Sequence, residues 1–325
     1  MGWSIFVSRR LPEAGIDLLT KKCETVDIYP EETAPPRSEL LRRVEDRDAL
    51  LCLLSDDIDG EVMDAAGPAL RVIANYAVGY DNIDVEAATE RGIPVTNTPG
   101  VLTETTADLA WALLFAVSRR VAEADSYMRE QEWPGWHPLQ MLGMDITGRT
   151  LGIIGAGRIG SAMARKSAGF NMRVLYNAHH DRPELEEELG AELTSIDDVL
   201  RRSDFISLHV PLTEETHHLI GTAELKRMKE TAVLVNTSRG AVVDESALLE
   251  ALESGEIFGA GLDVFEYEPT LTEGLRELDN VVLTPHIGSA SRATRSKMAE
   301  MAANSILTVL EDGQPENCVN PDVFA

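Results

Sequence analysis

The chain has 325 residues, of which 44% are hydrophobic, and a formal net charge of −26 at pH 7. This length suits about two domains of ~100–200 residues each, and no apolar run approaches the ~20 residues that a membrane-spanning helix needs. The strong negative charge argues against nucleic acid and anionic membrane surfaces as partners, because their phosphate groups would be repelled.

The acidic composition also suggests adaptation to high salt. The chain contains only six lysines against 55 aspartates and glutamates, and salt screens the repulsion among so many carboxylates. An ordinary acidic cytosolic enzyme is the alternative. The N-terminus lacks the features of a secretory signal, and Cys23, Cys52 and Cys318 are widely spaced without a metal-ligand pattern. We therefore expect a cytoplasmic protein with reduced thiols and no metal cofactor.

The first 99 residues alternate short apolar runs with stretches of helical periodicity. Such alternation is typical of a parallel sheet with crossover helices. Strands are predicted at 5–7, 26–29, 49–54, 71–77 and 94–98, and helices at 12–22, 38–44, 60–66 and 85–91.

One long helix is predicted over residues 103–128, leading from the first domain into a second. The following segment, 132–138 (EWPGWHP), contains two tryptophans beside proline and glycine and cannot form a regular helix. Exposed tryptophans in such a loop favour a subunit contact. We therefore expect a homodimer.

The segment 150–160 (TLGIIGAGRIG) combines a short apolar run with a glycine-rich turn and the start of a helix. Gly155 allows the strand to turn sharply, Gly157 allows the backbone to approach a pyrophosphate, and Gly160 allows close helix–strand packing. The helix N-terminus would then face the phosphate with free N–H groups. The pattern predicts a dinucleotide site, although on this stretch alone a methyltransferase is an alternative.

The remaining chain continues the same alternation. Strands are predicted at 172–176, 204–210, 232–236, 258–264 and 281–284, with helices at 183–189, 196–202, 222–228 and 245–252. With the strand before the glycines, these match a doubly wound dinucleotide-binding domain. A last helix, 291–310, is expected to return to the first domain. The predicted fold class is α/β with two doubly wound parallel-sheet domains: a flavodoxin-like substrate domain (1–99 and 290–325) and an inserted Rossmann cofactor domain (100–289).

Three side chains suited to carbonyl reduction follow predicted strands: Arg239, Glu268 and His286. Ligands of parallel sheets bind beyond the carboxyl ends of the strands, so the three should converge. Histidine donates protons near neutral pH, and a neighbouring carboxylate orients the imidazole and stabilises its protonated form. The planar guanidinium of arginine binds a substrate carboxylate with two hydrogen bonds. These groups predict hydride transfer between a nicotinamide cofactor and a 2-oxo acid.

Each of these residues also has an ordinary structural interpretation. Arg239 could form a surface ion pair, Glu268 lies in an acidic stretch, and His286 could cap a turn after Pro285. Because all three are predicted at one edge of one sheet, we favour the functional interpretation.

The segments around these residues, 235–240 (VNTSRG), 263–269 (DVFEYEP) and 284–290 (TPHIGSA), resemble signature segments of the D-2-hydroxyacid dehydrogenase family. The resemblance extends over essentially the whole chain. Within the family, 53–57 (LLSDD) and 133–138 (WPGWHP) are similar to the glyoxylate/hydroxypyruvate reductases.

The resemblance implies individual roles. Arg239 would bind the substrate carboxylate, His286 would be the acid/base and Glu268 its partner, and Asp263 would hold the nicotinamide carboxamide. Substrate contacts are implied for the backbone of Val78 and Gly79, for Leu54, and for Trp136 of the neighbouring subunit. Further cofactor contacts are expected from Thr105, Arg158, Ile159, His209, Val210, Pro211, Thr216, Thr237, Ser238 and Gly288.

The cofactor preference is predicted from the residues after the strand at 172–176. NAD-specific sites usually carry an acidic residue about 20 positions beyond the glycines, but this position is Asn177. His179 and Arg182 offer donor groups to a 2′-phosphate, whereas Asp181 would oppose it. We expect NADP(H) to be favoured, with NAD(H) possible through hydrogen bonds of Asn177.

Leu53, Leu54 and Trp136 suggest a small substrate pocket, which favours glyoxylate or hydroxypyruvate. A preference for larger oxo acids stays open, because one methylene changes binding by only ~1–3 kcal/mol. The same fold could also act on phosphite or formate, or serve as a non-catalytic NAD(H)-sensing scaffold. The intact set of Arg239, Glu268 and His286 argues against the scaffold.

Overall fold

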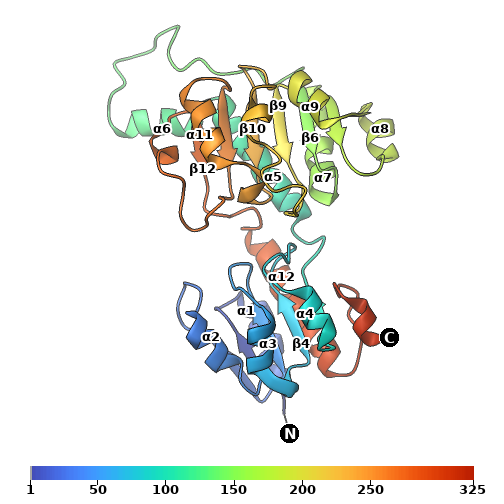
Figure 1. The fold of residues 1–325 in the computed structure, drawn as a ribbon. Coiled ribbons are helices and arrows are strands. Elements are labelled where there is room, and N and C mark those ends of the chain that lie inside the picture. Colours follow the sequence, from blue (N-terminus) through green and yellow to red (C-terminus); the bar gives the residue numbers. More distant parts are fainter. Residues whose placement is uncertain (1) are drawn as a thin grey trace. The chain divides into compact units, whose positions relative to one another are not determined.

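The computed structural model describes residues 2–325, which form two compact units (Figure 1). The first contains the chain up to Leu102 together with Ser289–Ala325, and the second contains Thr103–Gly288. Each unit is built around one parallel sheet, which confirms the predicted α/β class. Within residues 2–325, no helix is both long enough and apolar enough to cross a membrane.

The sheet of the first unit has the strand order β2-β1-β3-β4-β5, which is the flavodoxin-like order. Its core strands are buried on both faces because helices cover both sides. The strands are β1 (Ser4–Val7), β2 (Thr25–Ile28), β3 (Ala49–Cys52), β4 (Val72–Asn75) and β5 (Val95–Thr96).

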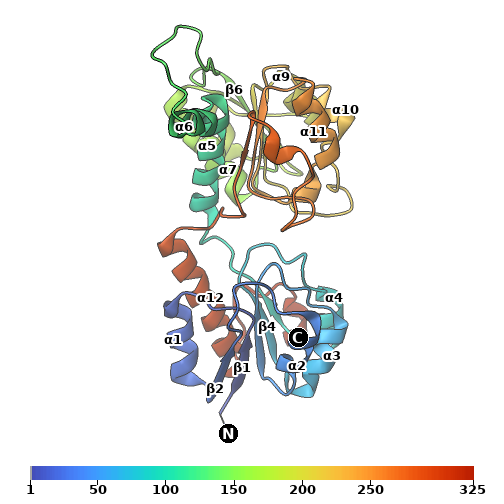
Figure 2. The same ribbon diagram turned by 90° about the vertical axis from the view of Figure 1, so that its left-hand side faces the viewer.

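Helices from both ends of the chain complete the first unit. One face carries α1 (Glu13–Lys22) and α12 (Arg292–Leu310), and the other carries α2 (Arg37–Val44), α3 (Gly60–Ala66) and α4 (Val85–Glu90) (Figure 2). A Cβ on Gly15 of α1 would lie 2.6 Å from the carbonyl oxygen of Ala299 in α12. This close packing explains why the C-terminal helix belongs to the N-terminal unit.

The sheet of the second unit has seven parallel strands in the order β12-β11-β10-β9-β6-β7-β8. The chain moves from β6 outward in one direction and then returns to continue from β9 in the other, so the order reverses between β6 and β9. The strands are β6 (Thr150–Ile154), β7 (Arg173–Asn177), β8 (Glu192–Leu193), β9 (Phe205–Leu208), β10 (Val233–Asn236), β11 (Gly259–Leu262) and β12 (Val281–Leu283).

Helices cover both faces of this second sheet as well (Figure 2). One face is covered by α5 (Thr103–Ser118) and α7 (Arg158–Lys166), and the other by α9 (Ile196–Arg202), α10 (Thr222–Leu225) and α11 (Glu245–Glu253). Two further helices are α6 (Val121–Arg129), which follows α5, and α8 (Pro183–Leu189), which packs beside α7.

The second unit differs from the predicted elements in two places. The expected single helix over 103–128 is interrupted between α5 and α6, because Arg120 adopts a left-handed conformation with φ of 52°. Its guanidinium bonds the carboxylate of Glu123, which stabilises the start of the new helix. The edge strand β8 was not predicted, because its two exposed residues form no apolar run. Most other elements are present with ends displaced by a few residues.

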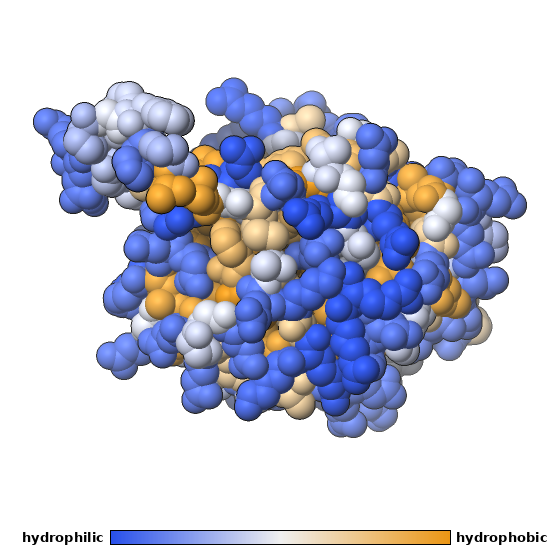
Figure 3. Space-filling model, turned by 90° about the horizontal axis from the view of Figure 1, so that it is seen from above, coloured by the Kyte–Doolittle hydropathy of each residue, from blue (hydrophilic) through white to orange (hydrophobic). Residues whose placement is uncertain are grey.

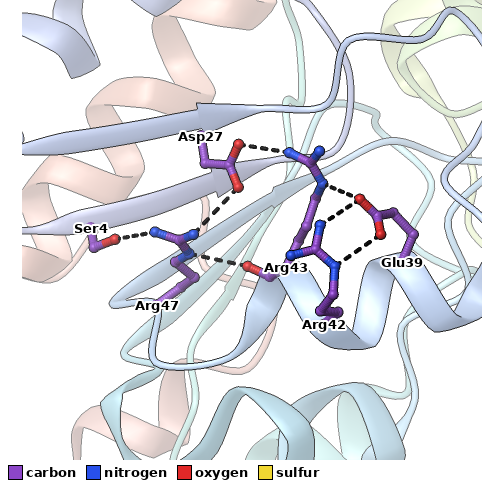
Figure 4. Close-up of polar contacts among 6 residues, drawn as sticks. All are labelled: Ser4, Asp27, Glu39, Arg42, Arg43 and Arg47. Carbon is purple, nitrogen blue, oxygen red and sulfur yellow. Dashed lines mark hydrogen bonds and ion pairs between the residues drawn. The ribbon is translucent and has the colours of Figure 1, made fainter.

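Arginine-centred ion pairs fasten α2 to the edge of the first sheet (Figure 4). Arg43 bonds Glu39 at 2.6 Å and Asp27 of β2 at 2.7 Å, while Arg42 bonds Glu39 and Arg47 bonds Asp27. Hydrogen bonds from Arg42 and Arg43 lower the pKa of Glu39 to about 2. A network of this kind stays charged over most of the pH range, although each surface pair adds only ~0–1 kcal/mol.

Candidate active site

The glycine-rich turn joins β6 to α7 at the point where the strand order reverses. Gly155 has φ of 96°, and a Cβ there would lie 2.7 Å from the carbonyl carbon of His209, just beyond β9. A Cβ on Gly160 would lie 2.2 Å from the carbonyl oxygen of Gly155. Both positions therefore require glycine, as the sequence pattern predicted.

The start of α7 has the features of an anion site. Gly157 is the N-cap residue in an extended conformation, offers no side-chain cap, and has no atom within 4 Å of an added Cβ. The N–H groups of a first helical turn, here Arg158, Ile159 and Gly160, have no partners inside the helix. Donors without partners, beside a Gly157 with open space around it, suit the pyrophosphate of a dinucleotide.

The residues expected near the adenosine ribose lie beside this turn. Arg182 donates from Nε to the carbonyl oxygen of Ala156, between the first two glycines, at 2.6 Å. Asn177, the last residue of β7, donates from Nδ2 to the carbonyl oxygen of Thr194 at 2.9 Å. His179 is exposed. Arg182 thus places a positive charge at the glycine-rich turn. The residue that ends β7, Asn177, carries no negative charge.

The segment after β9 contributes a neutral histidine and a hydroxyl-stabilised turn. His209 shares a hydrogen bond of 2.9 Å between Nε2 and Ser207 Oγ, and burial lowers the pKa of His209 to about 4. Thr216 donates from Oγ1 to the carbonyl oxygen of Pro211 at 2.6 Å, and Val210 packs against the hydrophobic core. An uncharged His209 suits a packing role better than proton transfer.

The loop after β10 is shaped by Asn236, which is 1% exposed. Its Nδ2 donates to the carbonyl oxygen of Arg239 at 2.9 Å, and its Oδ1 accepts hydrogen bonds from the N–H and hydroxyl of Ser238. Thr237 Oγ1 is buried and has no hydrogen-bond partner within residues 2–325. This unpaired hydroxyl lies at the carboxyl end of the sheet.

Gly240 allows the loops after β10 and β11 to touch. A Cβ at this position would lie 1.8 Å from the carbonyl carbon of Phe265, which is far shorter than any real contact. Arg239 is therefore held next to the segment that carries Glu268. Asn236 and Gly240 lie in the segment 235–240 (VNTSRG) but were not predicted as site residues, although asparagine is a known turn-former.

Glu268 and His286 form the hydrogen-bonded pair that the sequence predicted. Glu268 Oε2 lies 2.9 Å from His286 Nδ1, and Glu268 Oε1 accepts the N–H of Phe265 at 3.0 Å. Burial by itself raises the pKa of Glu268, but the net effect of its surroundings is to lower this pKa. The hydrogen bond and charge of His286 contribute most to the lowering, and Phe265 and Arg239 contribute less. The carboxylate is therefore ionised at neutral pH.

Asp263 fixes the turn that presents His286. It is 1% exposed, and it accepts hydrogen bonds of 2.7 Å from Thr284 Oγ1, Ile287 N and Gly288 N. Burial raises its pKa, although these three donors favour the ionised form. His286 itself has φ of 51°, a left-handed conformation that the surrounding hydrogen bonds maintain.

The structure thus brings Arg239, Glu268 and His286 together. They follow β10, β11 and β12, which are neighbours in one sheet, and the charge of Arg239 acts on Glu268. Thr105 lies in the first turn of α5, and Thr284, which sequence analysis did not single out, secures Asp263.

In the first unit, Val78 and Gly79 follow the end of β4. Their carbonyl oxygens accept side-chain hydrogen bonds, that of Val78 from Asn97 Nδ2 at 2.7 Å and that of Gly79 from Asn75 Nδ2 at 2.8 Å. The N–H groups of Val78 and Gly79 donate to no protein group in the described part of the chain. Leu54, from the loop after β3, is exposed.

The segment between α6 and β6 exposes large apolar side chains. Trp136 is 82% exposed and Trp133 50%, and Leu139 and Leu142 are exposed as well. Figure 3 shows hydrophobic areas between extensive hydrophilic surface on the face seen from above. Such exposure of tryptophan in one monomer is characteristic of a binding surface.

Comparisons with known proteins agree with this geometry. Residues 111–288 match the model for the NAD binding domain of D-isomer specific 2-hydroxyacid dehydrogenases. The glyoxylate reductase of Korarchaeum cryptofilum is 56% identical over 98% of this chain and 96% of its own length.

Solved structures resemble the chain over its whole length. The TT0316 protein from Thermus thermophilus has a TM-score of 0.92 and 48% identity, covering 97% of this chain and 99% of its own. The NADPH-dependent glyoxylate/hydroxypyruvate reductase from Sinorhizobium meliloti, in complex with NADP and malonate, has a TM-score of 0.86 and 34% identity, covering 100% and 98%. These similarities show that the chain belongs to the D-isomer specific 2-hydroxyacid dehydrogenase family, whose members are NAD(P)-dependent oxidoreductases.

Proposed function

We propose that this enzyme reduces glyoxylate, and also hydroxypyruvate, to the corresponding 2-hydroxy acid. The observation that carries the proposal is the 2.9 Å hydrogen bond between Glu268 and His286 at the sheet edge that also carries Arg239. The similar protein from Korarchaeum cryptofilum is named a glyoxylate reductase, and that from Sinorhizobium meliloti a glyoxylate/hydroxypyruvate reductase. A bound nicotinamide dinucleotide would supply the hydride.

His286 is the proton donor in this proposal. Its Nδ1 is engaged by Glu268, so Nε2 is the atom that delivers the proton to the carbonyl oxygen of the substrate. The ionised Glu268 selects this tautomer and stabilises the protonated ring. Arg239 binds the substrate carboxylate and stabilises the negative charge that develops on the carbonyl oxygen.

Asp263 retains the capacity to position the nicotinamide. Its Oδ1 accepts two hydrogen bonds, from Thr284 and Ile287, whereas its Oδ2 accepts only that of Gly288. A carboxylate oxygen has two lone pairs, so Oδ2 can accept one more N–H, such as that of a carboxamide. Thr237 supplies a second unpaired polar group at this edge. We place Thr105, Ser238 and Gly288 around the same end of the cofactor.

We infer a preference for NADP(H) over NAD(H). Arg182 lies at the glycine-rich turn, and Asn177 carries no charge that would repel a 2′-phosphate. Replacing Arg182 by alanine should raise the KM for NADPH about 10- to 100-fold, since a charge-assisted hydrogen bond contributes ~1.5–3 kcal/mol, and should leave the KM for NADH nearly unchanged. Equal effects on both cofactors would contradict the assignment; Arg201→Ala, on the exposed surface of α9, is the control.

We propose Val78 and Gly79 as further substrate contacts, as the resemblance to the family implies. Hydrogen bonds from Asn97 and Asn75 to the carbonyl groups of Val78 and Gly79 fix this stretch of backbone. The N–H groups of Val78 and Gly79 are therefore suited to bind the substrate carboxylate. Leu54, and Trp136 from a second subunit, would restrict the pocket to small substrates. The exposed tryptophan segment supports a homodimer, which size-exclusion chromatography with light scattering can test.

The acidic composition supports function in a salt-rich cytoplasm. Net charge of −26 with six lysines destabilises a compact chain at low ionic strength and less so when salt screens the charges. Full stability and activity at low salt would exclude this adaptation.

The decisive experiment follows oxidation of NADPH and NADH by absorbance, with glyoxylate, hydroxypyruvate and pyruvate, in low and molar salt. We expect the highest kcat/KM for glyoxylate or hydroxypyruvate with NADPH, and a rate that rises with salt. Faster turnover of pyruvate would overturn the substrate assignment. Oxidation of neither cofactor under any condition would overturn the enzymatic assignment.

A further inference from the structure

A cluster of metal-ligating side chains lies outside the residues assigned to the reaction. His217 and His218 belong to the segment between β9 and α10, and Glu266 belongs to the loop after β11. His218 Nε2 lies 2.8 Å from Glu266 Oε1, and one ligand atom of each residue lies within 4.8 Å of the other two. In the described part of the chain, no other group of three such residues meets this criterion.

The distances suit a transition-metal ion. Ligand atoms bound at ~2.0–2.1 Å to one tetrahedral or octahedral ion are separated by ~2.9–3.4 Å. The His218–Glu266 distance of 2.8 Å is already close to this range. The rings of His217 and His218 are stacked with centroids 4.1 Å apart, so a rotation of His217, which is exposed, would bring its nitrogen to the ion.

Two of the three ligands are held in place by the surrounding backbone. His218 has φ of 51°, and its N–H donates to the carbonyl oxygen of Ala241 at 2.8 Å. The N–H of Glu266 donates to Glu245 Oε1 at 2.6 Å, and the side chain of Glu245 is 2% exposed. A preformed pair of ligands costs little ordering free energy on binding.

We propose that His217, His218 and Glu266 bind one divalent transition-metal ion, with water completing its coordination. Two imidazoles and one carboxylate favour Zn²⁺, Ni²⁺ or Co²⁺ over Mg²⁺ and Ca²⁺, which prefer oxygen ligands alone. The ion would link the segment before α10 to the loop that carries Glu268, and would stabilise the second unit without entering the reaction.

Calorimetric titration of the metal-stripped full-length protein with Zn²⁺, and separately with Ni²⁺, tests the proposal. We expect binding of one equivalent of the ion per chain and a melting temperature that rises with the ion concentration. His217→Ala and Glu266→Gln should each weaken binding at least about tenfold.

His180→Ala is the matched control, because His179 and His180 form a second adjacent histidine pair with both side chains exposed. This variant should bind Zn²⁺ as the unchanged protein does. Equal weakening by His180→Ala, unchanged binding in His217→Ala, or no saturable binding at all would overturn the proposal. Circular dichroism of each variant confirms folding, so that loss of binding is not confused with loss of structure.

Discussion

The hydrogen bond between Glu268 and His286 predicts a specific loss of activity when the carboxylate is replaced. Glu268→Gln keeps the shape of the side chain and removes its charge. The hydrogen bond that orients the imidazole for proton donation then changes from a charged to a neutral one. We therefore expect kcat/KM for glyoxylate to fall.

The size of the loss follows from the strength of one hydrogen bond. A hydrogen bond to a charged group contributes ~1.5–3 kcal/mol, and a neutral one ~0.5–1.5 kcal/mol. The two side chains are 26% and 31% exposed, so solvent screening favours the lower end of the difference, about 1–1.5 kcal/mol. At 1.36 kcal/mol per factor of ten in rate, this loss corresponds to a fall in kcat/KM of about 5- to 10-fold.

The measurement is kcat/KM for glyoxylate at neutral pH and saturating NADPH. The KM for NADPH should change little, because Glu268 lies away from the glycine-rich turn. Glu273→Gln, which replaces an exposed carboxylate in the same segment, should leave kcat/KM unchanged. A kcat/KM of Glu268→Gln that equals or exceeds that of the unchanged enzyme would refute the role of this pair.

Three further substitutions test the same site. His286→Asn should lower kcat about 10²- to 10⁴-fold with a much smaller change in KM; asparagine is chosen because it tolerates the left-handed backbone at this position. An unchanged kcat would remove His286 from the mechanism. Arg239→Lys should lower kcat/KM for the oxo acid about 10- to 100-fold, because the point charge of lysine loses the paired hydrogen bonds worth ~1.5–3 kcal/mol. A near-normal KM for the oxo acid would contradict binding of its carboxylate by Arg239. Gly240→Ala should destabilise the protein by about 1–3 kcal/mol or more, because the Cβ of the alanine would overlap Phe265. Chemical denaturation measures the change in the free energy of unfolding. The control is Gly169→Ala, because a Cβ at Gly169 meets no atom within 4 Å.

Much of the architecture could be predicted because it depends on local pattern. Apolar runs alternating with helical periodicity indicate parallel α/β units wherever both faces of a sheet are covered. The spacing of Gly155, Gly157 and Gly160 indicates a strand–turn–helix because only glycine permits those close approaches. Arg239, Glu268 and His286 could be grouped because the carboxyl ends of parallel strands share one edge.

Other features depend on contacts between distant parts of the chain. The strand β8 exists only because β7 offers an edge for pairing. The overlap that makes Gly240 necessary involves Phe265, and the pairing of His218 involves Glu266. The sequence by itself determined the fold class and the chemistry of the strand ends, because those follow from local periodicity and residue type. Only the tertiary structure decided which side chains meet, because the partners are brought together by packing rather than by spacing in the chain.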